Sequence, residues 1–283
     1  MFTVFLTIVV GFGWFFSYLF DNSAILFFAV FFSASMAIIS YWHSDKIVLT
    51  MAKAIPIERK NNPELYNIVE NLAIAGGLPA PKIYLIDETA PNAFATGRDP
   101  RHSVIAVTTG LLNKLDRSEL EGVISHELSH IGNRDMLLST AVVVLVGFIS
   151  LISDMFVRSM FWSGRSRRNE RNESGGVIFL IGMAFAILAP IAATLMRLAI
   201  SRKREFLADA DGALLTRYPE GLAKALEKIS ADSTPMQTAN NTTSHLWIDN
   251  PFKGKNRASG FGKLFMTHPP VEERIKALRD MSI

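Results

Sequence analysis

Val123-Ile-Ser-His-Glu-Leu-Ser-His-Ile-Gly-Asn-Arg134 is the stretch around which the chain is organised. It contains an H-E-x-x-H motif, His126 to His130, in a segment with helical periodicity of its apolar residues. Because residues four apart share one face of a helix, the two histidines can place two imidazole nitrogens on one metal ion. Glu127 projects about 100° further round the helix. A general base for a water molecule beside the metal should stand there.

The competing interpretation is a helix that carries two histidines by chance. It is disfavoured because the chain has only 6 histidines in 283 residues, and a pair with this spacing in a well-formed helix is rarely accidental. Among biological metals, zinc is the one that this motif usually binds. The sequence therefore predicts one Zn²⁺ per chain, held in part by His126 and His130.

A third protein ligand must come from elsewhere, since two histidines and a water leave tetrahedral zinc one ligand short. The chain has no cysteine, so that ligand is a histidine or a carboxylate. Glu205 is the best candidate, because it opens the apolar patch Glu-Phe-Leu-Ala on a predicted helix. Asp209 shares its face and can hold the second ring nitrogen of a zinc-bound histidine. Alternatively, Glu205 balances the cluster Arg202 to Arg204, and Asp209 is solvated.

The composition is that of a membrane protein. Hydrophobic residues make up 49% of the chain, charged residues 19%, and the mean hydropathy is +0.24. The formal charge of +3 is too small to indicate a nucleic-acid partner. Without cysteines there are no disulfides, which fits a reducing compartment.

Two uncharged runs at the N-terminus, residues 2–20 and 24–42, each approach the length that crosses a bilayer, and they predict a transmembrane hairpin. A cleaved signal peptide is disfavoured because a basic start and a small-residue cleavage site are both missing. The basic residues that follow within 43–60 mark the cytoplasmic side.

A second apolar pair, residues 136–153 and 177–199, follows the motif and predicts another hairpin. Five arginines in its loop, residues 158–176, conflict with the positive-inside rule if both segments span the bilayer. The alternative is a hairpin that is only partly buried in the membrane.

The remaining residues predict a compact α+β unit made of pieces from both sides of the second hairpin. Asp116 can cap the motif helix, with Glu119 completing a capping box. Other predicted helices cover residues 63–75, 202–212, 219–231 and 269–281, and strands cover 82–86, 103–107 and, more weakly, 92–97. The predicted organisation is an N-terminal hairpin (1–43), a first catalytic part (44–135), a second hairpin (136–200) and a second catalytic part (201–283).

Several further motifs accompany His126-Glu-Leu-Ser-His130 in a fixed order. They are Asn92-Ala-Phe-Ala-Thr-Gly97, Glu205-x-x-x-Asp209, and Thr267-His-Pro-Pro270 with Arg274. Together they resemble the family of heat-shock membrane metalloproteases, which also includes the CAAX prenyl proteases, over nearly the whole chain. The resemblance implies a mainly α membrane protein with a small zincin-like (gluzincin) α+β catalytic domain and a short sheet. It also implies a cytoplasmic active site in a bacterial inner membrane, with a role in membrane-protein quality control under stress.

The resemblance further implies zinc on His126, His130 and Glu205, with Glu127 as the catalytic carboxylate. His268 and Arg274 become candidates for stabilising the oxyanion of the reacting peptide; otherwise they are a surface turn and a solvated helix face. Asn92, Ala93, Phe94, Ala95 and Thr96 are candidates for an edge strand to which an extended substrate adds, or they form an ordinary sheet edge.

The predicted function is cleavage of misfolded or damaged membrane proteins, and of unfolded soluble segments, at the cytoplasmic face. One alternative is a prenyl-peptide protease with the same chemistry. The other is a non-enzymatic membrane protein with structural zinc, which needs a fourth protein ligand such as His268. The expected partners are polypeptide substrates and the lipid bilayer, with no nucleic acid.

Overall fold

A computed structural model describes the chain except for residues 1, 20, 145–201, 240–242, 254–268 and 283. Its contacts divide the chain into two compact units, residues 1–42 with 144–195, and residues 43–143 with 196–283. Most of the predicted second hairpin and the candidate His268 lie outside the described residues. The topology of that hairpin therefore stays a prediction.

The first predicted hairpin consists of α1 (Phe2–Leu19) and α2 (Ser23–Met51). Of the described helices, α2 alone is long and apolar enough to cross a membrane, whereas α1 contains a shorter apolar stretch, Val9–Tyr18. A Cβ atom on Gly13 would lie 2.3 Å from the Cβ of Ala29, so the two helices touch where only glycine fits. The predicted basic segment 43–60 is partly helical, because α2 continues to Met51.

A four-stranded sheet in the order β1-β2-β4-β3 forms one layer of the catalytic unit. The strands are β1 (Ile55–Pro56), β2 (Lys82–Ile86), β3 (Ala93–Gly97) and β4 (Ser103–Thr108). β2 and β4 are parallel, while the β1–β2 and β3–β4 pairs are antiparallel. The three predicted strands are confirmed. β3 lies at an edge of the described sheet, where an extended peptide could be added.

The helices of this unit follow the predicted order closely. They are α3 (Pro63–Ala75), α4 (Thr109–Lys114), α5 (Arg117–Gly132), α8 (Arg202–Thr216), α9 (Pro219–Ala231) and α10 (Val271–Arg279), with short 3₁₀ helices at Pro100–His102 and Ser244–Leu246. Residues 136–144 are also helical. The predicted capping box is present, since Asp116 accepts from the backbone N–H of Glu119 and Glu119 accepts from that of Asp116.

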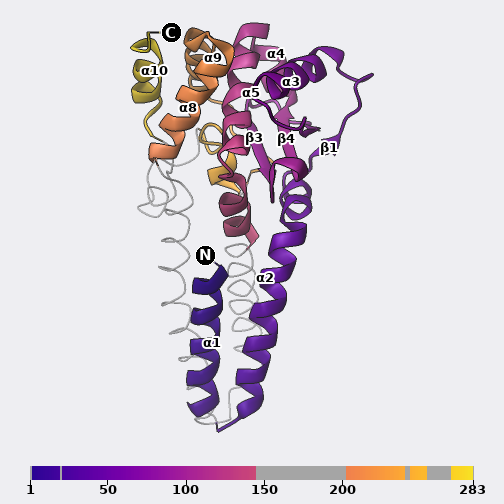
Figure 1. Cartoon of the computed structure of the whole chain (residues 1–283), viewed down its shortest axis with the longest axis vertical. Coiled ribbons are helices and arrows are strands. Elements are labelled where there is room, and N and C mark those ends of the chain that lie inside the picture. Colours follow the sequence, from indigo (N-terminus) through magenta and orange to yellow (C-terminus); the bar gives the residue numbers. More distant parts are fainter. Residues whose placement is uncertain (1, 20, 145–201, 240–242, 254–268, 283) are drawn as a thin grey trace, which may run out of the picture. The chain divides into compact units, whose positions relative to one another are not determined.

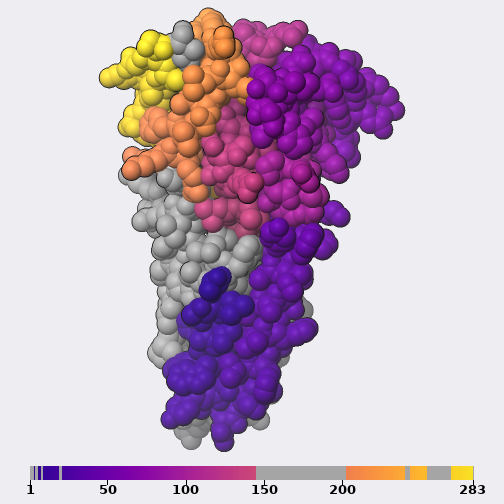
Figure 2. Space-filling model, in the orientation of Figure 1, coloured from indigo at the N-terminus to yellow at the C-terminus, as the bar shows by residue number. Residues whose placement is uncertain are grey.

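α5 is the central helix of the catalytic unit, in contact with β3 on one side and with α8 and α9 on the other (Figure 1). Two glycines permit these close approaches. A Cβ atom on Gly122 would lie 2.6 Å from the backbone nitrogen of Leu222, and one on Gly212 would lie 3.0 Å from that of His126. α8 therefore packs backbone to backbone against the motif. The surface of α10 adjoins that of α8 and α9 (Figure 2).

Candidate metal centre and active site

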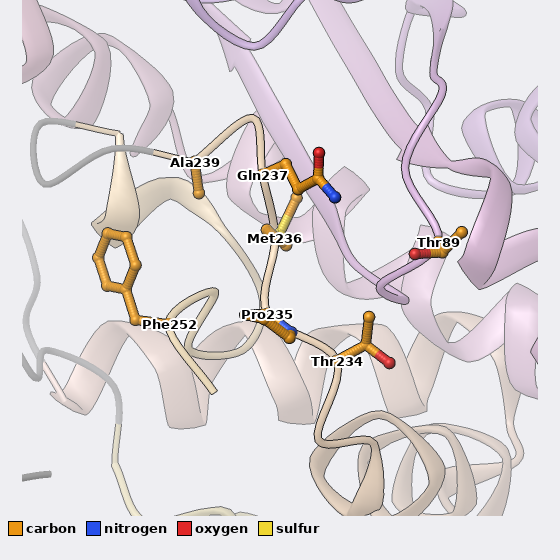
Figure 3. A pocket seen from close by; sticks show the side chains of 7 residues that line it. All are labelled: Thr89, Thr234, Pro235, Met236, Gln237, Ala239 and Phe252. Carbon is orange, nitrogen blue, oxygen red and sulfur yellow. The ribbon is translucent and has the colours of Figure 1, made fainter. Parts of the chain in front are cut away.

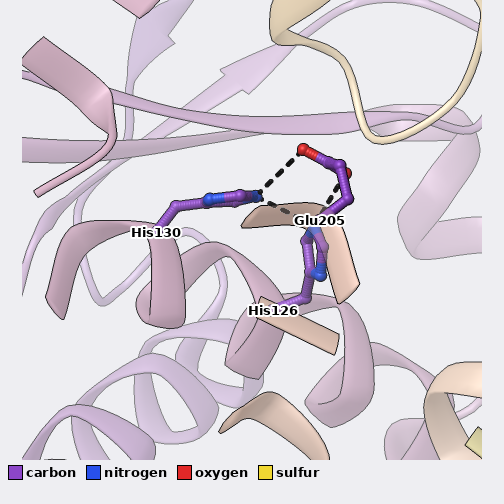
Figure 4. A group of neighbouring side chains, drawn as sticks. All are labelled: His126, His130 and Glu205. Carbon is purple, nitrogen blue, oxygen red and sulfur yellow. Dashed lines mark hydrogen bonds and ion pairs between the residues drawn. The ribbon is translucent and has the colours of Figure 1, made fainter. Parts of the chain in front are cut away.

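The H-E-x-x-H motif lies in the last turns of α5, and Glu205 lies in the first turn of α8. The structure brings His126, His130 and Glu205 together, with one donor atom from each within 4.8 Å of the others (Figure 4). His126 is 1% exposed and Glu205 is 6% exposed. Polar groups are seldom buried in this way unless they are paired or bind a metal.

The donor atoms have the separations that zinc requires. His126 Nε2 and His130 Nε2 are 3.2 Å apart, and the Glu205 carboxylate oxygens lie 3.9 Å and 3.6 Å from these two nitrogens. Tetrahedral zinc with bonds of about 2.0–2.1 Å places its ligand atoms roughly 3.3 Å apart. Two imidazoles and one carboxylate therefore fit three corners of such a site and leave the fourth for water or substrate.

Both histidines are oriented by carboxylates on their other ring nitrogens. His126 Nδ1 lies 2.9 Å from Asp209 Oδ1, the contact predicted from the i, i+4 spacing with Glu205. His130 Nδ1 lies 3.3 Å from Asp135 Oδ2, a contact that the sequence analysis did not predict. A carboxylate on Nδ1 fixes the tautomer in which Nε2 is free to bind a metal. The two Nε2 atoms are thus directed at the same point.

Asp135 is positioned by the end of α5 itself. Its backbone N–H donates to the carbonyl of His130, and its other carboxylate oxygen lies 3.7 Å from Arg204. Replacing Asp135 with asparagine is expected to weaken zinc binding by about 10–100-fold, because the His130 ring loses its anionic partner. Competition with a chromophoric chelator measures this change. Asp211→Asn is the matched control, since Asp211 pairs with exposed Asn133; equal affinities of the two variants would contradict the role.

Glu127 has the environment of a general base. It is 2% exposed, and the backbone N–H of Ala95 in β3 lies close enough to its carboxylate to oppose the rise of its pKa. Burial raises the pKa of Glu127 to about 7; the charge of Glu205 acts in the same direction, and that of His130 opposes it. A carboxylate with a pKa near neutrality can both accept and return a proton.

Arg274 reaches the site from α10, with 2% of its surface exposed. Its Nε and NH2 atoms donate to the two oxygens of Asp209 at 2.8 Å and 2.7 Å. NH1 donates to the carbonyl of Ile248 at 3.2 Å and lies 3.8 Å from Glu205. The Asp209 charge holds the pKa of Arg274 above its usual range despite burial. These contacts favour a role in positioning His126 through Asp209 over direct contact with a substrate.

The segment predicted to bind substrate comprises Asn92 and most of β3, all of it buried. This strand contacts α5, and the backbone N–H of Ala95 acts on the Glu127 carboxylate, so the strand passes beside the proposed base. The amide of Asn92 contacts the backbone of Asp249, and the carbonyl of Ala93 accepts from Ile248. The edge is thus partly occupied by the chain's own C-terminal region, a feature that no local pattern in residues 92–97 indicates.

A separate pocket of about 580 Å³ lies between Thr89 on one side and Phe252 on the other (Figure 3). Its remaining lining residues are Thr234, Pro235, Met236, Gln237 and Ala239. These side chains carry no titratable group, and none of them was predicted as a site residue. Among the described residues, the group of His126, His130 and Glu205 on α5 and α8 is therefore the better candidate for catalytic chemistry.

The chain is similar to a well-populated group of known proteases. The model of peptidase family M48 matches residues 59–282. Protease HtpX homolog of Thermoanaerobacter pseudethanolicus is 51% identical over 87% of this chain and 81% of its own length. Protease HtpX homolog of Caldanaerobacter subterraneus subsp. tengcongensis is 49% identical over 99% and 93%. Among solved structures, S. mikatae Ste24p has a TM-score of 0.52 at 21% identity and covers 96% of this chain, which spans 62% of that one.

A buried H-E-x-x-H helix that faces a carboxylate as third candidate ligand, in a chain with an apolar helix long enough to cross a bilayer, defines a membrane metalloprotease. The chain belongs to peptidase family M48. The resemblance that the sequence motifs suggested is confirmed, and so is protease activity as its class of function.

Proposed function

We propose that this chain is a zinc-dependent endopeptidase that cleaves misfolded or damaged membrane proteins, and unfolded soluble segments, at the cytoplasmic face of a bacterial inner membrane under stress. The observation that carries the proposal is the buried Glu127 carboxylate beside the cluster of His126, His130 and Glu205. Relatives named Protease HtpX homolog, at about half identity over most of the chain, support the same class of activity.

Zinc bound by His126, His130 and Glu205 would supply Lewis-acid activation of water and of the peptide carbonyl. Glu127 accepts the proton of the attacking water and returns it to the leaving nitrogen. Burial favours this cycle, because it brings the pKa of Glu127 close to neutrality. Asp209 and Asp135 hold the two imidazoles in place, and Arg274 holds Asp209. His268 remains our candidate for a donor to the oxyanion.

An extended substrate would lie along β3, with main-chain hydrogen bonds supplying most of the binding. Such binding tolerates many side chains, as a protease for misfolded proteins requires. The basic residues within 43–60 support a cytoplasmic catalytic unit. The proposed topology keeps the boundaries predicted above, with hairpins at 1–43 and 136–200. A prenyl-peptide protease is less well supported, because relatives at about half identity are named HtpX.

Proteolysis by the purified, full-length protein in lipid nanodiscs tests the proposal. An unfolded casein-type substrate should be cleaved at internal bonds when zinc is present. A chelator should abolish cleavage, and added zinc should restore it. The reason is that, without the metal, nothing at the three predicted ligands activates the attacking water. Fragments identified by mass spectrometry measure the activity. Cleavage that continues unchanged in metal-free protein would refute the proposal.

A further inference from the structure

The edge of β3 is not open along its whole length. Residues Leu246-Trp-Ile-Asp249, here called the strap, run beside its first half. The backbone N–H of Ile248 donates to the carbonyl of Ala93 at 3.0 Å. At the next residue of the strap, the side-chain amide of Asn92 forms two hydrogen bonds with the backbone of Asp249. It donates to the carbonyl at 2.9 Å and accepts from the N–H at 3.4 Å.

The strap runs antiparallel to β3 and is joined to it by one backbone hydrogen bond and by side-chain contacts. Ile248 lies opposite Ala93, and on either side of this pair Asp249 contacts Asn92 and Trp247 contacts Phe94. The residue numbers therefore increase along β3 in the direction in which they decrease along the strap. This is the mode in which an extended peptide commonly adds to a sheet edge, since antiparallel pairs outnumber parallel ones. The strap thus occupies part of the surface that a substrate would use.

The strap is held in place by a buried side chain and by a hydrogen bond to a buried arginine. Trp247 is 0% exposed, and its ring meets Phe94 edge to face with centroids 4.8 Å apart. The carbonyl of Ile248 accepts from Arg274, the same guanidinium that holds Asp209. Removing the strap would expose a buried tryptophan and take a partner from a buried arginine. With these contacts, we expect the strap to stay in place when a substrate binds.

Among the described residues, the strap forms no hydrogen bond with β3 beyond Ala93. The chain before the strap forms the 3₁₀ helix Ser244–Leu246, in which His245 contacts the backbone of Ser139. Backbone groups that face outward recur at every second residue of a strand, so Ala93, Ala95 and Gly97 face the edge. The carbonyl of Ala93 is taken by the strap, and the N–H of Ala95 lies next to the Glu127 carboxylate. Within the part of the chain that the structure describes, the carbonyl of Ala95 and the outward-facing backbone of Gly97 form no hydrogen bond, so both groups could pair with a substrate.

We propose that the strap sets substrate specificity by occupying the edge of β3 on one side of the scissile bond. An antiparallel substrate runs from Gly97 toward Ala95, where Glu127 marks the reacting bond. Its residues on the N-terminal side of that bond pair with β3. Its residues on the C-terminal side meet the strap after about one or two positions, since Ala93 is only roughly 7 Å beyond Ala95. The substrate must then turn away from the sheet.

This inference rests on the proposed function and is tested with the zinc-loaded, full-length protein. One peptide is selected from the casein-type substrate, its scissile bond is identified by mass spectrometry, and it is shortened by single residues from each end. Removing the third residue on the N-terminal side should lower kcat/KM by about fivefold to tenfold, the value of one lost main-chain hydrogen bond. Removing the third residue on the C-terminal side should change kcat/KM by less than about twofold, because no pairing is lost there.

A second measurement tests whether the strap stays in place or is displaced when the peptide binds. The parent peptide is added to the Glu127→Gln variant, and the fluorescence of Trp247 is obtained as the difference from a variant that also carries Trp247→Phe. A fixed strap predicts an unshifted emission. A red shift, or equal losses on shortening either end, would overturn the inference while leaving the protease assignment intact. Failure of the zinc-loaded protein to cleave any peptide would instead refute the proposed function.

Discussion

Replacing Glu127 with glutamine is expected to lower kcat/KM by about 10²–10⁴-fold, the usual contribution of a general acid–base group. Glutamine has nearly the same shape and can keep the contact with the Ala95 backbone, but it cannot accept a proton from water. Because the side chain is not one of the three predicted ligands, bound zinc should stay at one per chain. Rates of peptide cleavage and metal analysis on the same sample measure both quantities.

Glu121→Gln is the matched control for this substitution. Glu121 lies on the same helix and forms a surface ion pair with Arg117. Its replacement should leave kcat/KM within about twofold, since exposed pairs contribute little. Full activity of the Glu127 variant would contradict the proposed base. Loss of activity together with loss of zinc would show that Glu127 acts as a ligand.

Replacing Arg274 with methionine is expected to lower the free energy of unfolding by about 3–5 kcal/mol, the cost of breaking a buried ion pair on one side only. Asp209 would then be buried with its charge opposed by no arginine. Its pKa, which the Arg274 charge holds below the usual range against burial, should rise. Zinc affinity should fall as well, because Asp209 orients His126. Thermal unfolding in detergent and chelator competition measure the two effects.

Arg279 on the same helix offers the control, since it pairs with Glu220 and Glu227 at the surface. Arg279→Met should leave both stability and zinc affinity nearly unchanged. The double variant Arg274→Met with Asp209→Leu removes both charges and should recover much of the stability, but not the zinc affinity. An Arg274 variant as stable as the Arg279 variant would show that the buried pair is not formed.

Much of the catalytic unit could be predicted because its local signals agree with its tertiary contacts. The motif helix shows its cap, its apolar face and its two histidines within 17 residues of sequence, Asp116 to Gly132, and the structure has all three. The strands at Lys82–Ile86 and Ser103–Thr108 are short apolar runs bounded by turn residues. Glu205 could be selected because the acidic side chain begins an apolar patch.

The features that were missed depend on contacts between segments distant in sequence. β1 has two residues, one of them proline, and exists only by pairing with β2. Asp135 could have been suggested as a carboxylate just past the histidine helix, but its direction follows from the turn at Arg134, where φ is +59°. The strap lies in a polar stretch that reads as a loop. Its placement depends on Asn92, Phe94 and Arg274, all of which meet it only in the folded chain.

Titration of metal-free protein with zinc, for the wild type and for Glu205→Ala, tests the central claim most directly. We predict one zinc per chain in the wild type and an affinity lower by more than about 100-fold in the variant, beyond the 10–100-fold loss typical of residues that only orient a ligand. The variant should also lose proteolysis at zinc concentrations that saturate the wild type. An unchanged zinc affinity in Glu205→Ala would contradict the claim that His126, His130 and Glu205 together form the metal site.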